Sequence, residues 1–267
     1  MNVAKQYAEE LRENRPLIYE GLTFYPLSVK HFALYQNAKP AMELMLSTLP
    51  VRYVRMTWIE ALEALDREAA KENIRTGYFV SLLLLLNAAL QIDAVSHPEN
   101  LMIARKDDGR FGGLVITQGE TRTVLNENHF SKVREILAAQ NGYQIPDENW
   151  NPDLVRAQAY LREQKMNTTS SGSLEDAVFA LAAAVGQRAL EIYEWPIREF
   201  TQMQSAVDRR LRFMLCGAAE LSGQVKFTKG NPYPTWIWEH KSELPSGFTS
   251  LKELDDGAHG LLGEPNE

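Results

Sequence analysis

The sequence predicts a mainly α protein with a small antiparallel β region (an α+β fold), in which helical blocks flank a β-hairpin or three-stranded sheet. Apolar residues recur at helical spacing over most of the chain, and two short stretches instead carry strand-forming residues around glycine turns. A composition of 45% hydrophobic and 24% charged residues is that of an ordinary globular protein. At 267 residues the chain could form one large domain or two small ones.

The first block, residues 1–97, should combine a short β segment with several helices. Residues 18–25 are dominated by β-branched and aromatic side chains and predict a hairpin that turns near Glu20 and Gly21. After this hairpin the apolar spacing becomes helical. The predicted helices end before Pro40 and before Pro50, and a third helix follows the apolar stripe of Trp58, Leu62 and Leu65.

An almost continuous apolar run, residues 76–92, permits two interpretations. A membrane-spanning helix needs about 20 apolar residues, and this run is shorter and is interrupted by Ser81, Asn87 and Gln91. A helix that is apolar on all sides is also typical of the centre of a soluble core, which is the interpretation we favour. The polar start of the chain does not have the pattern of a signal peptide, so we expect a cytoplasmic protein that does not bind membranes.

The second block, residues 98–166, should hold the main β region followed by helices. Three short segments have strand composition: residues 101–104, 114–117 and 121–124. Turns are expected between the first two segments, at Asp108, Gly109, Gly112 and Gly113. Helix-capping and helix-ending residues follow, and they predict one helix from Asn126 to Gly142 and the start of another at Asn151.

The third block, residues 173–238, should again be helical, after a polar linker at residues 167–172. Ser173 and Asp176 have the spacing of a capping box and predict a helix that runs to about Ile192. Pro196 starts a long amphipathic helix, which should end near Gly223 and bury Ile197, Phe200, Met203, Val207, Leu211 and Leu215. Residues 239–267 form an acidic tail that should be extended.

The net charge of −7 is concentrated at the C-terminal end. The tail holds seven acidic residues against two lysines, so the rest of the chain is close to neutral. Such a chain would gain little from the release of phosphate counterions, and we expect no nucleic-acid partner. The single cysteine, Cys216, fits a reducing compartment, and its apolar neighbours predict a buried structural thiol.

The residues show no assembled catalytic, cofactor-binding or metal site. None of the five histidines lies at the i, i+4 spacing of a helical metal site or beside a second ligand in a zinc pattern. Gly109, Gly112 and Gly113 do not open a helix, so we expect a hairpin there and no phosphate-binding loop. We therefore predict that the protein is not an enzyme and acts by binding other proteins.

Two groups of side chains are candidates for protein binding. The densest basic cluster consists of Arg209, Arg210 and Arg212. This cluster is either a solvated helix face or an ionic contact with an acidic partner, such as the tail of this chain. An aromatic cluster set among prolines consists of Tyr233, Trp236 and Trp238. Aromatic side chains in such a segment either form an interface or pin the end of the chain onto the core.

Four parts of the chain, in order, carry a further signal: LTFYPLSVK at residues 22–30, HFSKVREI at 129–136 leading into QNG, SLED at 173–176 with WPIREF at 195–200, and AELSGQVKF at 219–227. Together they resemble a family of tail-module proteins from phages and prophages of Gram-positive bacteria. The resemblance implies a tail-assembly chaperone that binds tape-measure or tail-tube subunits before the tube forms. It would shield apolar helices of its partner in the cytoplasm of the infected or lysogenic host, as a monomer or homo-oligomer.

Two alternatives follow from the same sequence. The chain is longer than many such chaperones, which favours a structural tail or baseplate component of the virion as the close alternative. An enzyme or an antagonist of host defence is the second alternative. That function would require a site assembled from residues that lie far apart in the sequence.

Overall fold

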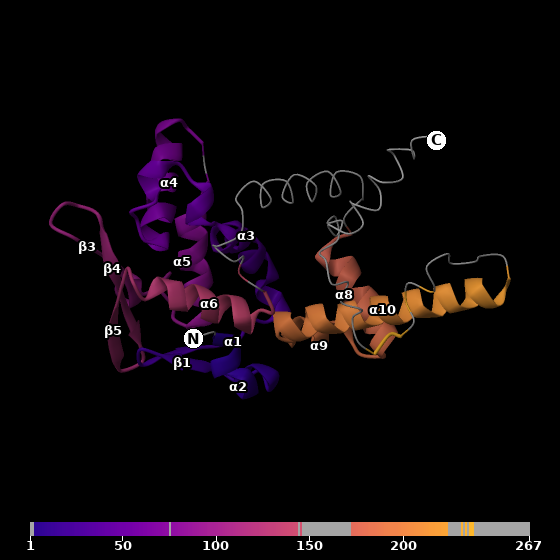
Figure 1. The fold of residues 1–267 in the computed structure, drawn as a ribbon. Helices are drawn as coiled ribbons and strands as arrows, with labels where there is room; N and C mark the ends of the chain where they lie inside the picture. Colours follow the sequence, from indigo (N-terminus) through magenta and orange to yellow (C-terminus); the bar gives the residue numbers. More distant parts are fainter. Residues whose placement is uncertain are drawn as a thin grey trace, which may run out of the picture. The chain divides into compact units, whose positions relative to one another are not determined.

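The computed structural model confirms the α+β class, because helices predominate and the strands form two small antiparallel sheets (Figure 1). It describes residues 3–74, 76–143, 145, 172–223, 231, 233 and 235–237. Contacts within the chain divide it into two units, Met1–Gln204 and Ser205–Glu267, which are described separately. The expected helix at Asn151, most of the expected linker, Trp238 and the acidic tail lie outside the described residues.

Unit 1 contains both sheets and most of the described helices. In chain order its helices and strands are α1 (Val3–Gln6), α2 (Ala8–Arg12), β1 (Leu17–Tyr19), β2 (Leu22–Phe24), α3 (Phe32–Glu43), α4 (Trp58–Lys71), α5 (Tyr78–Ala89), β3 (Leu101–Arg105), β4 (Phe111–Gln118), β5 (Thr121–Asn126), α6 (Phe130–Gln140), α8 (Leu174–Val185) and α9 (Ala189–Glu194). Short 3-10 turns lie at Val29–His31, Leu46–Thr48, Val51–Tyr53 and Pro98–Asn100. The long helix α10 (Ile197–Leu221) begins in unit 1 and continues into unit 2.

The N-terminal hairpin forms where the sequence predicts it. β1 pairs with β2 in an antiparallel register that places Tyr19 opposite Leu22. Between the strands, Glu20 and Gly21 have positive φ values of 52° and 76°, the left-handed geometry of a two-residue hairpin turn. Leu22 and Phe24 are fully buried, so this hairpin contributes directly to the core.

The three predicted strands of the second β region form one antiparallel sheet in the order β3-β4-β5. Its first turn lies at Asp108 and Gly109, as expected, but Gly112 and Gly113 belong to β4, so their assignment to a turn was wrong. Glycine occurs at position 113 because β4 and β5 approach each other closely there. A Cβ atom on Gly113 would lie 2.5 Å from the carbonyl oxygen of Leu125. Glycine in a strand can thus mark tight strand packing instead of a turn.

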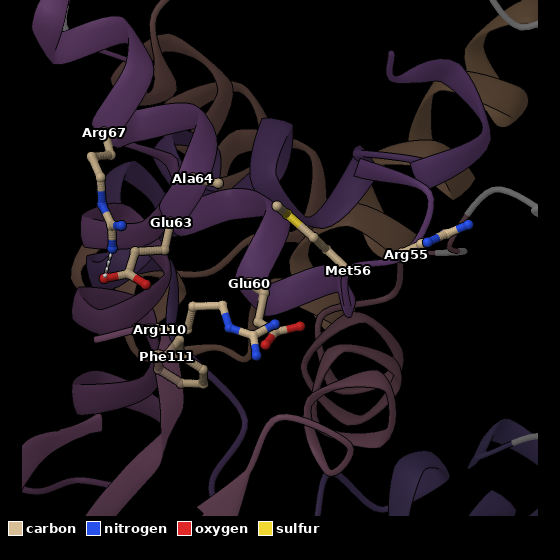
Figure 2. A pocket seen from close by; sticks show the side chains of 8 residues that line it. All are labelled: Arg55, Met56, Glu60, Glu63, Ala64, Arg67, Arg110 and Phe111. Carbon is tan, nitrogen blue, oxygen red and sulfur yellow. Dashed lines mark ion pairs between the residues drawn. The ribbon is translucent and has the colours of Figure 1, made fainter. Parts of the chain in front are cut away.

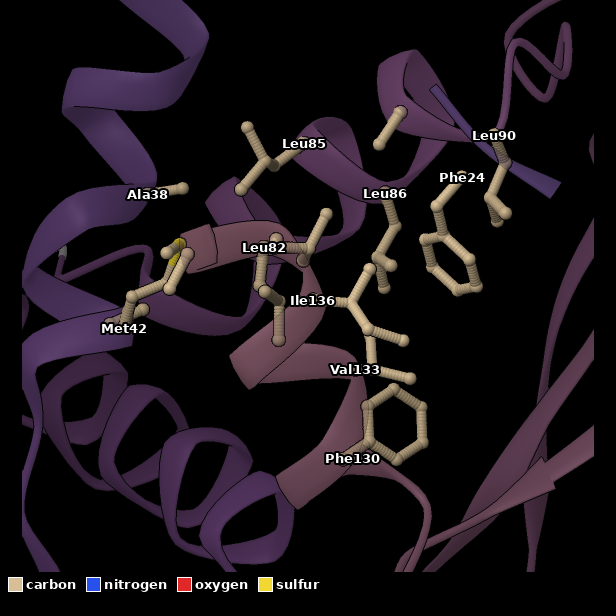
Figure 3. Packing of buried hydrophobic residues seen from close by; sticks show 14 of the residues in the cluster. Phe24, Ala38, Met42, Leu82, Leu85, Leu86, Leu90, Phe130, Val133 and Ile136 are labelled. Carbon is tan, nitrogen blue, oxygen red and sulfur yellow. The ribbon is translucent and has the colours of Figure 1, made fainter. Parts of the chain in front are cut away.

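One hydrophobic core joins helices α1 to α6 to both sheets (Figure 3). Helices α5 and α6 supply its centre with the fully buried side chains of Leu82, Leu85, Leu86, Phe130, Val133 and Ile136. The apolar run at residues 76–92 therefore forms a central core helix, as predicted. α5 has 12 residues, and none of the helices in the described part of the chain is long and apolar enough to cross a membrane.

A buried arginine holds the end of α3 against this core. Arg134 of α6, 6% exposed, donates from Nε to the carbonyl oxygen of Met42 (2.7 Å) and from Nη2 to that of Leu44 (2.9 Å). Its guanidinium carbon also lies 5.0 Å from the ring centroid of Trp58 in α4. The last carbonyl groups of a helix have no hydrogen-bond donor within the helix, and Arg134 supplies donors to two such groups at the end of α3. It thereby links α6 to α3 and α4.

Three helix boundaries differ from the predictions. α3 continues through Pro40 to Glu43, since a proline in the last turn removes only one helical hydrogen bond. Asn126 ends β5 and does not cap α6, because its side-chain oxygen accepts a hydrogen bond from the Asn128 amide at 3.0 Å. The capping box at Ser173 is confirmed, but the helix it opens ends at Gly186, whose φ of 70° separates α8 from α9.

Candidate protein-binding site

Contacts within unit 1 fix the first turn of α10. The Ile197 amide donates to the carbonyl oxygen of Leu27 (2.8 Å), and the Val29 amide donates to that of Trp195 (2.9 Å). Ile197 and Phe200 are buried, and the Phe200 ring meets that of Phe32 edge-on at 6.2 Å. The sequence prediction that α10 buries these two residues is therefore confirmed.

The part of α10 in unit 2 exposes a row of apolar side chains, which we call the α10 stripe: Val207, Leu211, Met214, Leu215, Ala218 and Leu221. Leu211 is 54% exposed, Leu215 is 70% exposed and Leu221 is 91% exposed. The prediction that Met203, Leu211 and Leu215 are inside was wrong, because all three are exposed. Helical periodicity defines an apolar face, but it does not tell whether the same chain covers that face.

The sequence analysis missed three members of this stripe: Met214, Ala218 and Leu221. Their spacing carries the signal that would have found them. From Val207 to Leu221 the apolar positions follow one another at intervals of four, three, four and three residues, which is a heptad pattern. The stripe is therefore a sequence-encoded feature whose exposure only the structure shows.

The two predicted groups of binding residues meet each other in unit 2. Arg212 Nη1 donates to the Tyr233 hydroxyl (2.8 Å), and its guanidinium carbon lies 5.7 Å from the Tyr233 ring centroid. The guanidinium of Arg210 lies 5.8 Å from the ring of Trp236, and Arg209 Nε lies 3.5 Å from the Trp236 carbonyl oxygen. We call this the arginine–aromatic cluster. Trp238, the sixth predicted residue, is outside the described part of the chain.

Arg209 and Arg212 lie on a different side of α10 from the stripe, whereas Arg210, three residues after Val207 and four before Met214, borders it. Because successive residues of an α-helix are about 100° apart, Arg209 and Arg212 lie roughly 160° and 100° around the axis from Leu211. Hydrogen bonds to Tyr233 and to Asp208 raise the pKa of Arg212, so its charge is held in place on this side. The aromatic segment contacts Arg209 and Arg212 on one side of α10 and Arg210 at the border of the stripe. Leu211, Leu215 and Leu221 of the stripe remain exposed, and Trp236 is itself 42% exposed.

Unit 1 carries a second surface feature, a small and shallow depression of about 100 Å³ beside α4 (Figure 2). It is lined by Arg55, Met56, Glu60, Glu63, Ala64, Arg67, Arg110 and Phe111. Glu63 accepts a hydrogen bond from Arg105 (2.6 Å) and forms an ion pair with Arg67 (3.3 Å). Glu60 pairs with Lys106 (3.2 Å), which also pairs with Glu127 (2.7 Å). These ion pairs link α4 to the β3–β4 hairpin.

The surroundings of Glu60 in this depression favour its charged form. Burial alone would raise the pKa of Glu60, but hydrogen bonds from Thr57 and Lys106 outweigh burial and hold that pKa below its ordinary value. A general acid at neutral pH needs a carboxyl group whose pKa is raised. The geometry therefore supports a structural role for Glu60, as the capping residue of α4 and as an ion-pair partner.

The described histidines and Cys216 each have a simple local setting. Within the described residues, no three His, Cys, Asp or Glu side chains lie close enough together to hold a metal ion. His31 contacts the Ser28 hydroxyl and His97 contacts Glu99, each at 3.3 Å. Cys216 is a free thiol and is partly exposed, so its predicted burial was wrong, because this half of α10 is itself largely exposed.

No protein-family model, no curated protein and no solved structure matches this chain.

Proposed function

We propose that this protein is a non-catalytic binding factor that holds an apolar helix of another protein along the α10 stripe. The observation that carries the proposal is the exposure of the stripe, where Met214 is 56% and Leu215 is 70% exposed. Contiguous exposed apolar surface costs free energy in water and marks interaction sites in soluble proteins. A helix in a partner protein with apolar residues at heptad spacing could remove this surface from water.

The resemblance to tail-module proteins suggests the biological setting. In this setting the partner is a tape-measure or tail-tube subunit, and the protein acts as a tail-assembly chaperone in the cytoplasm of an infected or lysogenic bacterium. A chaperone needs an apolar surface that its partner can bind during assembly and leave afterwards. The α10 stripe suits this role, because within one copy most of its side chains are exposed while the aromatic segment packs against the neighbouring arginines.

A pull-down from infected cells, combined with mass spectrometry of purified particles, tests this function. The tagged protein should recover tape-measure or tube subunits, and the purified particles should lack it. The double variant Leu211→Glu with Met214→Glu should lose about tenfold or more of this recovery, since buried carboxylates are costly. Val51→Glu, at an apolar residue of unit 1 that is 85% exposed, is the matched control and should bind normally.

Two results would contradict the proposal. A fixed copy number of the protein in purified particles would support a structural tail component in place of a chaperone. Undiminished recovery of the tail subunits by the double variant would show that binding occurs elsewhere on the chain.

A further inference from the structure

The heptad spacing along α10 indicates what kind of surface can cover the stripe. Including Gln204, the seam positions are Gln204, Val207, Leu211, Met214, Ala218 and Leu221. A repeat of 3.5 residues is satisfied by a second helix of the same period, packed side by side at a small crossing angle. A strand or a flat surface would match only part of such a seam.

From this pattern we propose that the α10 stripe of one copy binds the α10 stripe of a second copy of this chain when the partner protein is absent. This inference rests on the proposed function, because it assigns the resting state of the same surface. A second copy supplies a helix with the matching period, and every seam position is uncharged. The association is isologous, since the same stripe is used on both copies.

Charges around the seam are compatible with self-association. Asp208 and Arg210 flank it from opposite sides, and the Asp208 carboxylate forms an ion pair with Arg212 of the same helix at 2.8 Å. Arg209 and Arg212 hold the aromatic segment on the other side of α10. A second copy on the stripe therefore leaves the contacts of Arg209 and Arg212 in place, and Arg210, whose guanidinium lies over the Trp236 ring, remains at the edge of the seam.

The size of the seam predicts a weak association. Eighteen helical residues, from Gln204 to Leu221, span about 27 Å. One helix face of this length buries on the order of 400 Å² a copy, against about 800 Å² a side for a standard interface. We therefore expect a pair in the micromolar range, in which either stripe can be displaced by a better-matched helix.

Sedimentation velocity of the purified full-length chain, from about 1 to about 100 µM, tests the inference. The mass should rise with concentration from the monomer value of 30.3 kDa toward that of a dimer. Leu211→Glu with Met214→Glu should remain monomeric throughout, and Val51→Glu should associate like the unmodified chain. Both apolar residues of the stripe are exposed, so the double variant should keep the melting curve of the parent.

Three outcomes would overturn the inference. The first is a full-length chain that is monomeric at every concentration. The second is a double variant that associates as well as the parent. The third is a chain that dimerises only after truncation at Ile237, which would show that the C-terminal segment covers the stripe. Recovery of tail subunits by a monomeric protein would refute the self-association and leave the proposed function intact. A dimer that recovers no tail subunit would support the self-association and refute the proposed function.

Discussion

Arg134 is a charged residue inside the core, and its guanidinium takes the place of water at the carbonyl groups of Met42 and Leu44. Burying a charge is costly unless hydrogen bonds compensate for the lost hydration. Here the compensation comes from the end of α3 and from the face of Trp58. Arg134 therefore stabilises the end of α3 at Glu43. Pro40 alone led to the prediction that this helix ends earlier.

Replacing Arg134 by Met should lower the free energy of unfolding by about 3 kcal/mol, because it keeps apolar volume but leaves two buried carbonyl groups without their charged donor. Urea unfolding followed by circular dichroism measures this change. Arg122→Met, at an exposed arginine of β5, is the control and should change stability by less than about 0.5 kcal/mol. Equal losses in the two variants would argue against the role assigned to Arg134.

Two tyrosines near Glu43 should make unit 1 sensitive to alkaline pH. Burial, together with the carboxylate of Glu43, raises the pKa of Tyr35 from about 10 to about 12. Burial and Glu43 also raise the pKa of Tyr143, whose hydroxyl donates to Glu43 at 3.0 Å. The unfolded chain loses these protons at lower pH than the folded chain does. The stabilisation is therefore complete below pH 10 and is lost as the pH rises toward 12.

Tyr35→Phe should flatten this alkaline fall in stability by up to about 1.4 kcal/mol per pH unit, the value for one linked proton. Urea unfolding at several pH values between 8 and about 11.5 gives the two slopes. Near pH 8 neither protein should show this fall, because tyrosine is then protonated in both the folded and the unfolded chain. Parallel slopes for the two proteins would contradict the linkage.

At the scale of elements, the two glycines Gly113 and Gly217 should respond in opposite ways to the same substitution. Gly113→Ala places a methyl group 2.5 Å from a backbone oxygen of β5, which should cost about 1–3 kcal/mol. Gly217→Ala, in α10, meets no atom within 4 Å and should stabilise the helix by about 0.5–1 kcal/mol. Thermal unfolding of the two variants measures the effects. A loss of stability in Gly217→Ala would show that α10 is covered at this position.

The elements also show which parts of the structure are readable from sequence. The β1–β2 hairpin, the capping box at Ser173 and the central helix α5 depend on local turn chemistry and apolar periodicity, and the sequence predicts them. Gly113 and the end of α3 depend on Leu125 and Arg134, which are distant in sequence, and their predictions failed. For the candidate site, the residue types predicted the arginine–aromatic cluster as two groups, and only the structure joined them.

At the scale of the whole molecule, the acidic tail should oppose self-association. Residues 239–267 carry most of the net charge of −7, so two copies that approach each other bring two acidic tails together. A chain that lacks these residues should associate a few-fold more tightly at low salt. At about 1 M salt, where the Debye length is about 3 Å, the difference should vanish. Sedimentation at two salt concentrations measures both effects, and salt-independent behaviour of both proteins would contradict this role of the tail.

The bridge between Ser28 and Pro196 has a consequence for the order of events during synthesis. Leu27 and Val29 leave the ribosome roughly 170 residues before their backbone partners, Ile197 and Trp195, a delay of about 10–30 s at ordinary translation rates. Until then the segment that follows β2 lacks these backbone hydrogen bonds. Translation must therefore pass the start of α10 before unit 1 can close, and premature termination upstream would yield a chain that cannot complete its fold.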